Sequence, residues 1–366
     1  MRRREEAAIE LSEIIALFAD AHPVECEIKN TSRGENDFRE AVIVRRDRGS
    51  LPPAPGDGIV IKLADNGFTD PERIAMWERL AEEYRRRGCY CPRFLRTKAG
   101  EFPWVEYKGR RCVAYGEEFA RFRAASSFEA SDISPEGMFT YLDDVLRLNG
   151  EIAAAHLELT DLPSAWILFG TFDPADHEDE VMENARAWLA CAEKLPDRFR
   201  LQVARIWERW QENRAFLARE YHRLPASVFQ ADLNCTNVLL DEEGRFAGVM
   251  DFNLAGREVF LNYLFREVPF IFGAREEKPV PKESGSWTDE LLRRLIHGIE
   301  IVRESYAFCE AEKELALPLF RCLFPLWFTS VEQLKTAKGE KEIQAALDDT
   351  ERAQTLEIDF RAYMGG

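Results

Sequence analysis

Along the first third of the chain, apolar and polar residues alternate with the period of two that half-buried β-strands require. Five such runs occur, two of them within residues 24–48 on either side of a polar turn and the others at 58–63, 102–107 and 111–115. Asp70 and Pro71 are typical of a helix N-cap and first helical position, so a helix is expected from there to Gly88. Residues 24–116 are therefore predicted to form a five-stranded antiparallel sheet with one helix after the third strand.

The pattern changes after Gly116, where apolar residues recur at helical spacing and charged residues fill the outer faces. The predicted helices span residues 138–159, 179–195, 199–222, 288–309, 312–336 and 341–362. One β-rich segment, residues 226–252, interrupts them. The sequence thus predicts an α+β protein with a small sheet-containing lobe, residues 1–116, and a larger, mainly helical lobe, residues 117–366.

The most apolar segments of the chain indicate neither an export signal nor a membrane span. Apolar residues from Ala8 to Phe18 follow helical spacing and lack the continuous apolar core of a signal peptide. The most apolar stretch, residues 315–331, is interrupted by Pro318, Arg321 and Pro325. The eight cysteines form no CxxC pair, which favours a reducing, cytoplasmic location.

The formal net charge is −17, from 49 Lys and Arg against 66 Asp and Glu. This balance argues against a nucleic-acid binder or an anionic-membrane partner, both of which require surplus cations. The acidic surplus lies entirely in residues 117–366, whereas residues 1–116 are close to neutral. Two interpretations stay open: acidity for solubility, and acidity where a cationic small molecule docks.

Three oxygen-bearing side chains are predicted to converge at the β-rich segment. Asp241 to Gly244 form a turn between two short apolar strands, and Asn237 and Asp251 lie at equal distances along the chain on either side of Gly244. They should emerge together at the open end of one hairpin, where an amide oxygen and a carboxylate suit Mg²⁺. Asp232 lies on the loop that leads into this hairpin.

That arrangement suits phosphoryl transfer, in which two groups hold a metal on the nucleotide and a third carboxylate accepts the proton of the attacking hydroxyl. The phosphates also require a cation, and Lys62 lies unusually within an apolar strand. The alternative is an edge lysine that faces solvent. Glu78, in the helix that follows, is placed to hold the lysine.

The ordered set of motifs resembles the aminoglycoside phosphotransferase and choline kinase-like family, distant relatives of protein kinases. The family's His-Gly-Asp, its Asn five residues further along, and its metal-binding Asp after a hairpin are matched here. The matching segments are Gln230-Ala231-Asp232, Asn237 and Asp251-Phe252-Asn253, and the likeness extends over about residues 24–270. The resemblance implies a two-lobed protein kinase-like fold, with nucleotide in the first lobe and the acceptor in the second.

The resemblance also implies a role for each matched residue. Asp232 would be the catalytic base, Asn237 and Asp251 would bind Mg²⁺, and Lys62 would contact the phosphates of ATP, or of GTP, with Glu78 as its partner. The turn of residues 32–36, with Ser32 and Gly34, would cover the phosphates. The segment from Tyr115 through Glu117 to Glu118 would be the hinge, whose backbone holds adenine. The acceptor would be a hydroxyl of a small polar molecule such as an aminoglycoside-like antibiotic or an amino alcohol.

Three positions depart from the family pattern. Gln230 and Ala231 replace His and Gly, and Asn262 replaces an Asp that usually braces the catalytic loop. None of these changes removes a reacting group, so an active small-molecule kinase is expected. A non-catalytic nucleotide-binding module is the alternative. Protein phosphorylation is disfavoured because no Ala-Pro-Glu follows Asp251, and the oligomeric state is left open.

Overall fold

The computed structural model describes residues 2–19, 25–32, 34, 36–45, 58–128, 141–159, 163–173, 175–273 and 287–365. Contacts within the chain divide it into two compact units. The sheet unit comprises Met1–Tyr141, Asp173–Ala175 and Cys235–Leu254, and the helical unit comprises Leu142–Phe172, Asp176–Asn234 and Ala255–Gly366. The antiparallel sheet of the one and the helices of the other confirm the predicted α+β class. The lobe boundary expected after residue 116 stays a prediction.

The sheet unit is built on one antiparallel sheet of six strands in the order β1-β2-β3-β6-β4, with β5 paired to β6. The strands are β1 (Glu25–Asn30), β2 (Phe38–Arg45), β3 (Gly58–Asp65), β4 (Phe94–Leu95), β5 (Trp104–Tyr107) and β6 (Arg110–Glu118). The prediction of five strands was therefore wrong by one. β4 is two residues long, too short for any alternation to mark it in the sequence.

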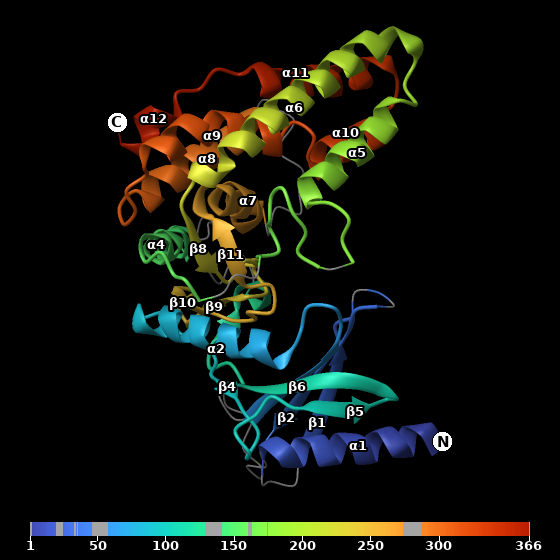
Figure 1. Ribbon diagram of the computed structural model, residues 1–366, viewed down its shortest axis with the longest axis vertical. Coiled ribbons are helices and arrows are strands. Elements are labelled where there is room, and N and C mark those ends of the chain that lie inside the picture. Colours follow the sequence, from blue (N-terminus) through green and yellow to red (C-terminus); the bar gives the residue numbers. More distant parts are fainter. Residues whose placement is uncertain are drawn as a thin grey trace. The chain divides into compact units, whose positions relative to one another are not determined.

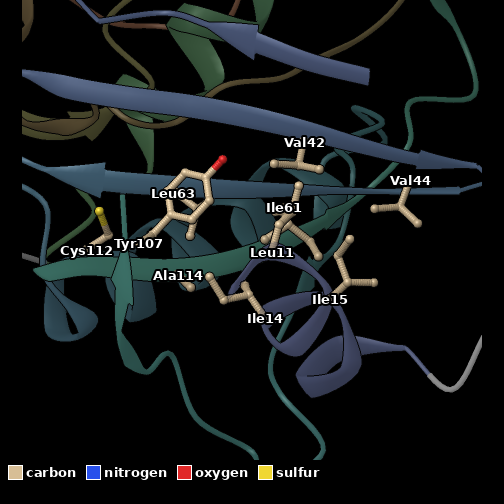
Figure 2. Close-up of a cluster of buried hydrophobic side chains, with 10 residues drawn as sticks. All are labelled: Leu11, Ile14, Ile15, Val42, Val44, Ile61, Leu63, Tyr107, Cys112 and Ala114. Atoms are coloured by element: carbon tan, nitrogen blue, oxygen red, sulfur yellow. The ribbon is translucent and has the colours of Figure 1, made fainter. Parts of the chain in front are cut away.

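One helix covers each face of this sheet (Figure 1). Helix α1 (Arg2–Phe18) packs Leu11, Ile14 and Ile15 on one face, in the buried cluster drawn in Figure 2. Ile61 and Leu63 of β3 point into that cluster. Because neighbouring strand residues alternate, Lys62 projects from the opposite face.

That opposite face is covered by α2 (Pro71–Arg86), which buries Ile74, Trp77 and Leu80. Asp70 is its N-cap, as predicted, and accepts a hydrogen bond from the Arg73 backbone at 2.8 Å. The predicted turn between β5 and β6 is also confirmed. Its two residues, Lys108 and Gly109, have φ of 53° and 71°, as a two-residue hairpin turn demands.

The helical unit contains most of the longer helices and one two-stranded antiparallel sheet. The sheet pairs β8 (Ala226–Phe229) with β11 (Gly256–Val259). The helices are α4 (Tyr141–Ala154), α5 (Glu180–Ala192), α6 (Arg200–Glu220), α7 (Phe260–Gly273), α8 (Trp287–Val302), α9 (Glu310–Leu323), α10 (Phe328–Thr336), α11 (Glu340–Thr355) and α12 (Phe360–Met364). Single 3₁₀ turns lie at Ala125–Ser127, Asp197–Phe199 and Tyr221–Arg223.

The helices differ from the prediction in three places. The helix expected over 312–336 is two helices, because Pro325 and the residues around it separate α9 from α10. The helix expected over 341–362 likewise ends at Thr355, before α12. Helix α7 had no place among the predicted helices, although its apolar residues follow helical spacing. Every residue from Phe260 to Val268 is buried.

Among the described residues, one segment, Glu310–Thr336, is long and apolar enough to cross a membrane by length and composition. It consists of α9 and α10, and 67% of its apolar window is buried inside the structure. The core helix of a folded domain gives the same signal, so this segment is weak support for a membrane span.

Candidate active site

The hairpin predicted around Gly244 is present in the sheet unit. Strands β9 (Val238–Leu240) and β10 (Phe246–Val249) pair antiparallel, and β7 (Arg123–Ala124) adds a third strand. An irregularity between Phe246 and Gly248 shifts the register by one residue. Asn237 consequently pairs with Met250, whose backbone N donates to the Asn237 carbonyl at 2.9 Å, and Asp251 follows directly. Both predicted metal ligands thus lie at the open end of the hairpin.

Lys62 on β3 forms an ion-paired cluster with two carboxylates. Its Nζ lies 2.9 Å from Asp251 Oδ1 and 3.0 Å from Glu117 Oε1. Only 19% of the Lys62 side chain and 10% of the Glu117 side chain are exposed. Lys62 therefore does not face solvent from a sheet edge, as the alternative interpretation had it, but joins β3 to the hairpin.

Burial and charge act against each other in this Lys62 cluster. Burial alone would lower the pKa of Lys62, but the charges of Asp251 and Glu117 raise the pKa well above its ordinary value. For Asp251, burial would raise the pKa, yet the Lys62 charge lowers it. Burial raises the pKa of Glu117, and Lys62 opposes that rise only in part. The lysine and Asp251 are thus a charged pair at neutral pH.

The expected partner of Lys62, Glu78, is bonded elsewhere. Glu78 Oε2 accepts hydrogen bonds from Arg96 at 2.6 Å and 3.2 Å. Glu117 supplies the carboxylate that pairs with the lysine instead. Lys62 on β3 pairs in register with Tyr115 on the neighbouring strand β6, and Glu117 lies two residues after Tyr115, on the same face of that strand. Alternation along 111–118 was the signal that could have identified Glu117 as the partner.

The residues expected to form the hinge lie within β6. Tyr115 is buried, its ring centroid is 5.8 Å from Lys62 Nζ, and burial raises the pKa of its hydroxyl. Gly116 and Glu117 pair with β4 as well as with β3, and the Glu118 backbone N donates to the Arg93 carbonyl at 2.9 Å. These residues take part in sheet pairing, and the next backbone N, that of Phe119, donates to the Gly58 carbonyl at 3.1 Å. The predicted hinge role of this segment stays a prediction.

Ser32 and Gly34 lie in the connection between β1 and β2. Ser32 Oγ accepts a hydrogen bond from the Arg39 backbone N at 2.9 Å, which closes that connection. Gly34 forms a bridge with Asp37, and a Cβ added at Gly34 would meet nothing within 4 Å. The neighbouring Arg33 and Glu35 lie outside the described residues. The predicted phosphate-covering role of the turn stays a prediction.

Asp232 lies in the helical unit, on the loop after β8. The buried Gln230 accepts a hydrogen bond from the Asp232 backbone N at 2.7 Å through Oε1, so it can brace the loop in place of the family's His. Asn234 Nδ2 donates to Asp232 Oδ1 at 2.7 Å. Ala231, in the place of the family's Gly, has φ of 65°, a left-handed conformation that a residue with a Cβ seldom adopts.

Asn237 and Asp251 have donor chemistry that fits a hard divalent cation. The Asn237 side chain is buried, Asp251 is partly exposed with φ of 60°, and each offers an oxygen. Among the residues that the structure describes, no group of three or more His, Cys, Asp or Glu could hold a metal ion. The two side chains therefore fit a magnesium site that is completed by phosphate oxygens and water, rather than an all-protein cage.

Two solved structures show which fold this chain shares with known proteins. Amicoumacin kinase hAmiN in complex with AMP-PNP, Ca²⁺ and Ami superposes with a TM-score of 0.52 at 12% identity, over 97% of this chain and 96% of the other. A microcompartment-associated aminopropanol kinase gives a TM-score of 0.50 at 13% identity, over 98% of each chain. At such low identity, these two structures show a shared fold.

No curated protein matches the chain. The sequence model of the phosphotransferase enzyme family, APH, matches residues 55–260, a range that begins just before β3 and includes Lys62, Asp232, Asn237 and Asp251. Because this match covers more than half of the chain, the protein belongs to the phosphotransferase enzyme family, and it is an enzyme of the small-molecule kinase type.

Proposed function

We propose that the protein transfers the γ-phosphoryl group of ATP to a hydroxyl of a small polar molecule. The observation that carries the proposal is the Lys62–Asp251 pair at 2.9 Å, which brings a cation and a candidate metal ligand together from positions 189 residues apart. A phosphate-binding cation beside a metal-binding carboxylate is what nucleotide phosphates require. Asn237, at the same end of the hairpin, is proposed as the second ligand.

In this proposal each residue has one task. Asp232 accepts the proton of the acceptor hydroxyl, and the hydrogen bonds from Asn234 and to Gln230 orient it. Lys62 binds the α- and β-phosphates, and Glu117 holds it in place. Asn237 and Asp251 hold Mg²⁺, which neutralises phosphate charge when bound. The predicted hinge segment receives the adenine.

The proposed acceptor is a hydroxyl compound with a cationic group. The acidic surplus of residues 117–366 favours a cation over an anion. The two structurally similar enzymes support the same class, since one phosphorylates an amino alcohol by name and the other is bound to AMP-PNP, an ATP analogue, and Ami. All eight cysteines are free, which supports a cytoplasmic location.

The test is a screen of ATP and GTP consumption against aminoglycosides, macrolides, amino alcohols, amino sugars and hydroxy amino acids. With the best acceptor, Asp232→Asn should lower kcat roughly 10²–10⁴-fold, because an amide cannot accept the proton. The KM for ATP should change little. A protein that binds ATP with Mg²⁺ but turns over no acceptor would contradict the proposal and favour a non-catalytic nucleotide-binding module. An Asp232→Asn variant with undiminished kcat would contradict the role of Asp232 as the base.

A further inference from the structure

A second buried carboxyl, on helix α7, contacts the loop that carries Asp232. Glu267 is 1% exposed. Its Oε2 accepts a hydrogen bond from the backbone N of Leu233 at 3.3 Å, and its Oε1 accepts one from Trp166 Nε1 at 2.7 Å. Leu233 directly follows Asp232, so the carboxyl holds the loop at the next peptide along the chain.

The residue expected to brace this loop is placed differently. The resemblance assigns that role to position 262, where this chain has Asn262. In the structure, Asn262 Nδ2 donates to the Trp166 carbonyl at 2.8 Å, so its side chain supports Trp166. The Trp166 indole in turn donates a hydrogen bond to Glu267, which lies five residues after Asn262 on α7. In this chain the residue of α7 that binds the loop through its side chain is therefore Glu267.

We propose that Glu267 is the positioning residue of the Asp232 loop in this chain. Together with Gln230 it clamps both sides of Asp232, since Gln230 accepts from the Asp232 backbone N and Glu267 accepts from the Leu233 backbone N. Two consecutive peptide groups, one on each side of the Asp232 α-carbon, are thereby held by side chains. The assignment rests on the proposed role of Asp232 as the base.

The protonation state of Glu267 agrees with a structural clamp. Burial, together with the charge of Asp232, raises the pKa of Glu267 to about 8, although the bonds from Trp166 and Leu233 and the charge of Arg266 act the other way. The charged groups that face it are Asp232 from the loop and Arg266 from α7, and Arg266 is paired with Glu180 of α5. A pKa this far above the ordinary value for a glutamate fits a carboxyl that is held inside the protein as a structural clamp.

The test compares Glu267→Gln with a matched control, Glu258→Gln. Glu258 is also buried in the helical unit, its pKa is raised by burial to about 7, and it accepts a hydrogen bond from Tyr221 at 3.0 Å. Glutamine at 267 can accept from Leu233 or from Trp166 but not from both, so one buried donor is left unpaired. We expect kcat to fall roughly tenfold for Glu267→Gln, with the KM for ATP unchanged. Amide exchange at Leu233 should accelerate, and Glu258→Gln should move neither quantity.

A second variant keeps the test valid if Glu267→Gln folds poorly. Trp166→Phe removes the competing donor, so the double variant Trp166→Phe, Glu267→Gln should recover slow exchange at Leu233 and much of the lost kcat. Unchanged exchange in Glu267→Gln, or equal effects in Glu258→Gln, would overturn the assignment. If Asp232→Asn leaves turnover intact, the proposed function fails, whereas the exchange at Leu233 still reports on the clamp by itself.

Discussion

Two buried carboxyl clusters, one in each unit, support the proposed chemistry in opposite ways. In the sheet unit, Lys62 joins Glu117 and Asp251 by ion pairs of 3.0 Å and 2.9 Å. In the helical unit, Glu267 holds Leu233 and Trp166 by hydrogen bonds from neutral donors. The first cluster is held by opposite charges, and the second by an acid whose pKa is raised to about 8.

The difference indicates which of these contacts a bound ligand could displace. In the proposed function, the partners in the charged pair have charged competitors, because nucleotide phosphates would bind Lys62 and a divalent cation would bind Asp251. A buried carboxyl that accepts two hydrogen bonds from neutral donors has no such competitor, and opening it would leave unpaired donors inside the protein. The sheet-unit cluster is therefore suited to rearrange when ligands bind, and the helical-unit cluster to remain closed.

The largest effect should come from removing the lysine that the sheet-unit cluster depends on. Lys62→Met keeps the length of the side chain but leaves Glu117 and Asp251 without their cation. Phosphoryl transfer should fall roughly 10²–10³-fold, because the phosphates lose a preorganised positive charge. The free energy of unfolding should fall by about 2 kcal/mol, because two partly buried carboxylates lose their partner. Steady-state kinetics and denaturant unfolding measure the two effects.

Lys108→Met is the matched control for that substitution. Lys108 also pairs with a buried carboxylate of the sheet unit, Glu40, at 2.6 Å, but on the face of the sheet that α1 covers. It should lower stability to a similar or smaller degree and leave turnover as it was. Equal losses of turnover in both variants would mean that Lys62 acts only by stabilising the sheet unit.

The next largest effect distinguishes the clusters by the pH dependence of stability. The folded pKa of Glu267 is raised to about 8 and that of Glu258 to about 7, so the folded state holds protons that the unfolded chain releases above about pH 4.5. Their contribution to stability is full at low pH and is lost as the pH rises through 7 and 8. Asp251 has a lowered pKa, so its contribution has the opposite sign and is lost as the pH falls.

Thermal unfolding measured between pH 5 and pH 8.5 should show this asymmetry. We expect the wild-type protein to lose about 2 kcal/mol or more of stability over that range, and Glu267→Gln to flatten the slope. Asp251→Asn should alter the acid limb, where the lowered pKa of Asp251 contributes to stability. A Glu267→Gln variant with the wild-type slope would show that this carboxyl is already ionised in the folded protein at neutral pH.

The sequence was sufficient for the parts of the site that depend on local spacing. Counting from Gly244 placed Asn237 and Asp251 at one end of a hairpin, and a lysine within an apolar strand marked Lys62. The register was still off by one residue, because the irregularity near Gly248 has no signature in spacing alone. Gly248 itself is required there, since an added Cβ would lie 1.9 Å from the Tyr90 carbonyl oxygen.

The partners of these residues could not be predicted in the same way. Glu117 and Glu267 meet Lys62 and Leu233 through strand register and helix packing, which depend on residues far apart in the chain. Glu78 was predicted because it lies in the helix after β3, and no spacing argument could reveal that Arg96 binds it instead. Helix α7, which carries Glu267, was missing from the prediction, so no packing partner for the Asp232 loop could be expected from that segment.

The smallest expected effect is that of Ala231→Gly. Ala231 is a left-handed residue of the helical unit, as Asp251 is of the sheet unit. Ala231→Gly relieves a strain of about 1–2 kcal/mol, but it also loosens the unfolded chain and removes a buried methyl group, which together cost about as much. Stability should therefore change by less than about 1 kcal/mol. Ala231→Val should lose about 3 kcal/mol or more, because a β-branched side chain is excluded from that conformation and the site is fully buried.

If the clamp of Gln230 and Glu267 holds this loop, exchange of the Leu233 amide should stay slow in Ala231→Gly. Rapid exchange in that variant would show instead that the alanine methyl group, rather than the two side-chain acceptors, keeps Asp232 in place.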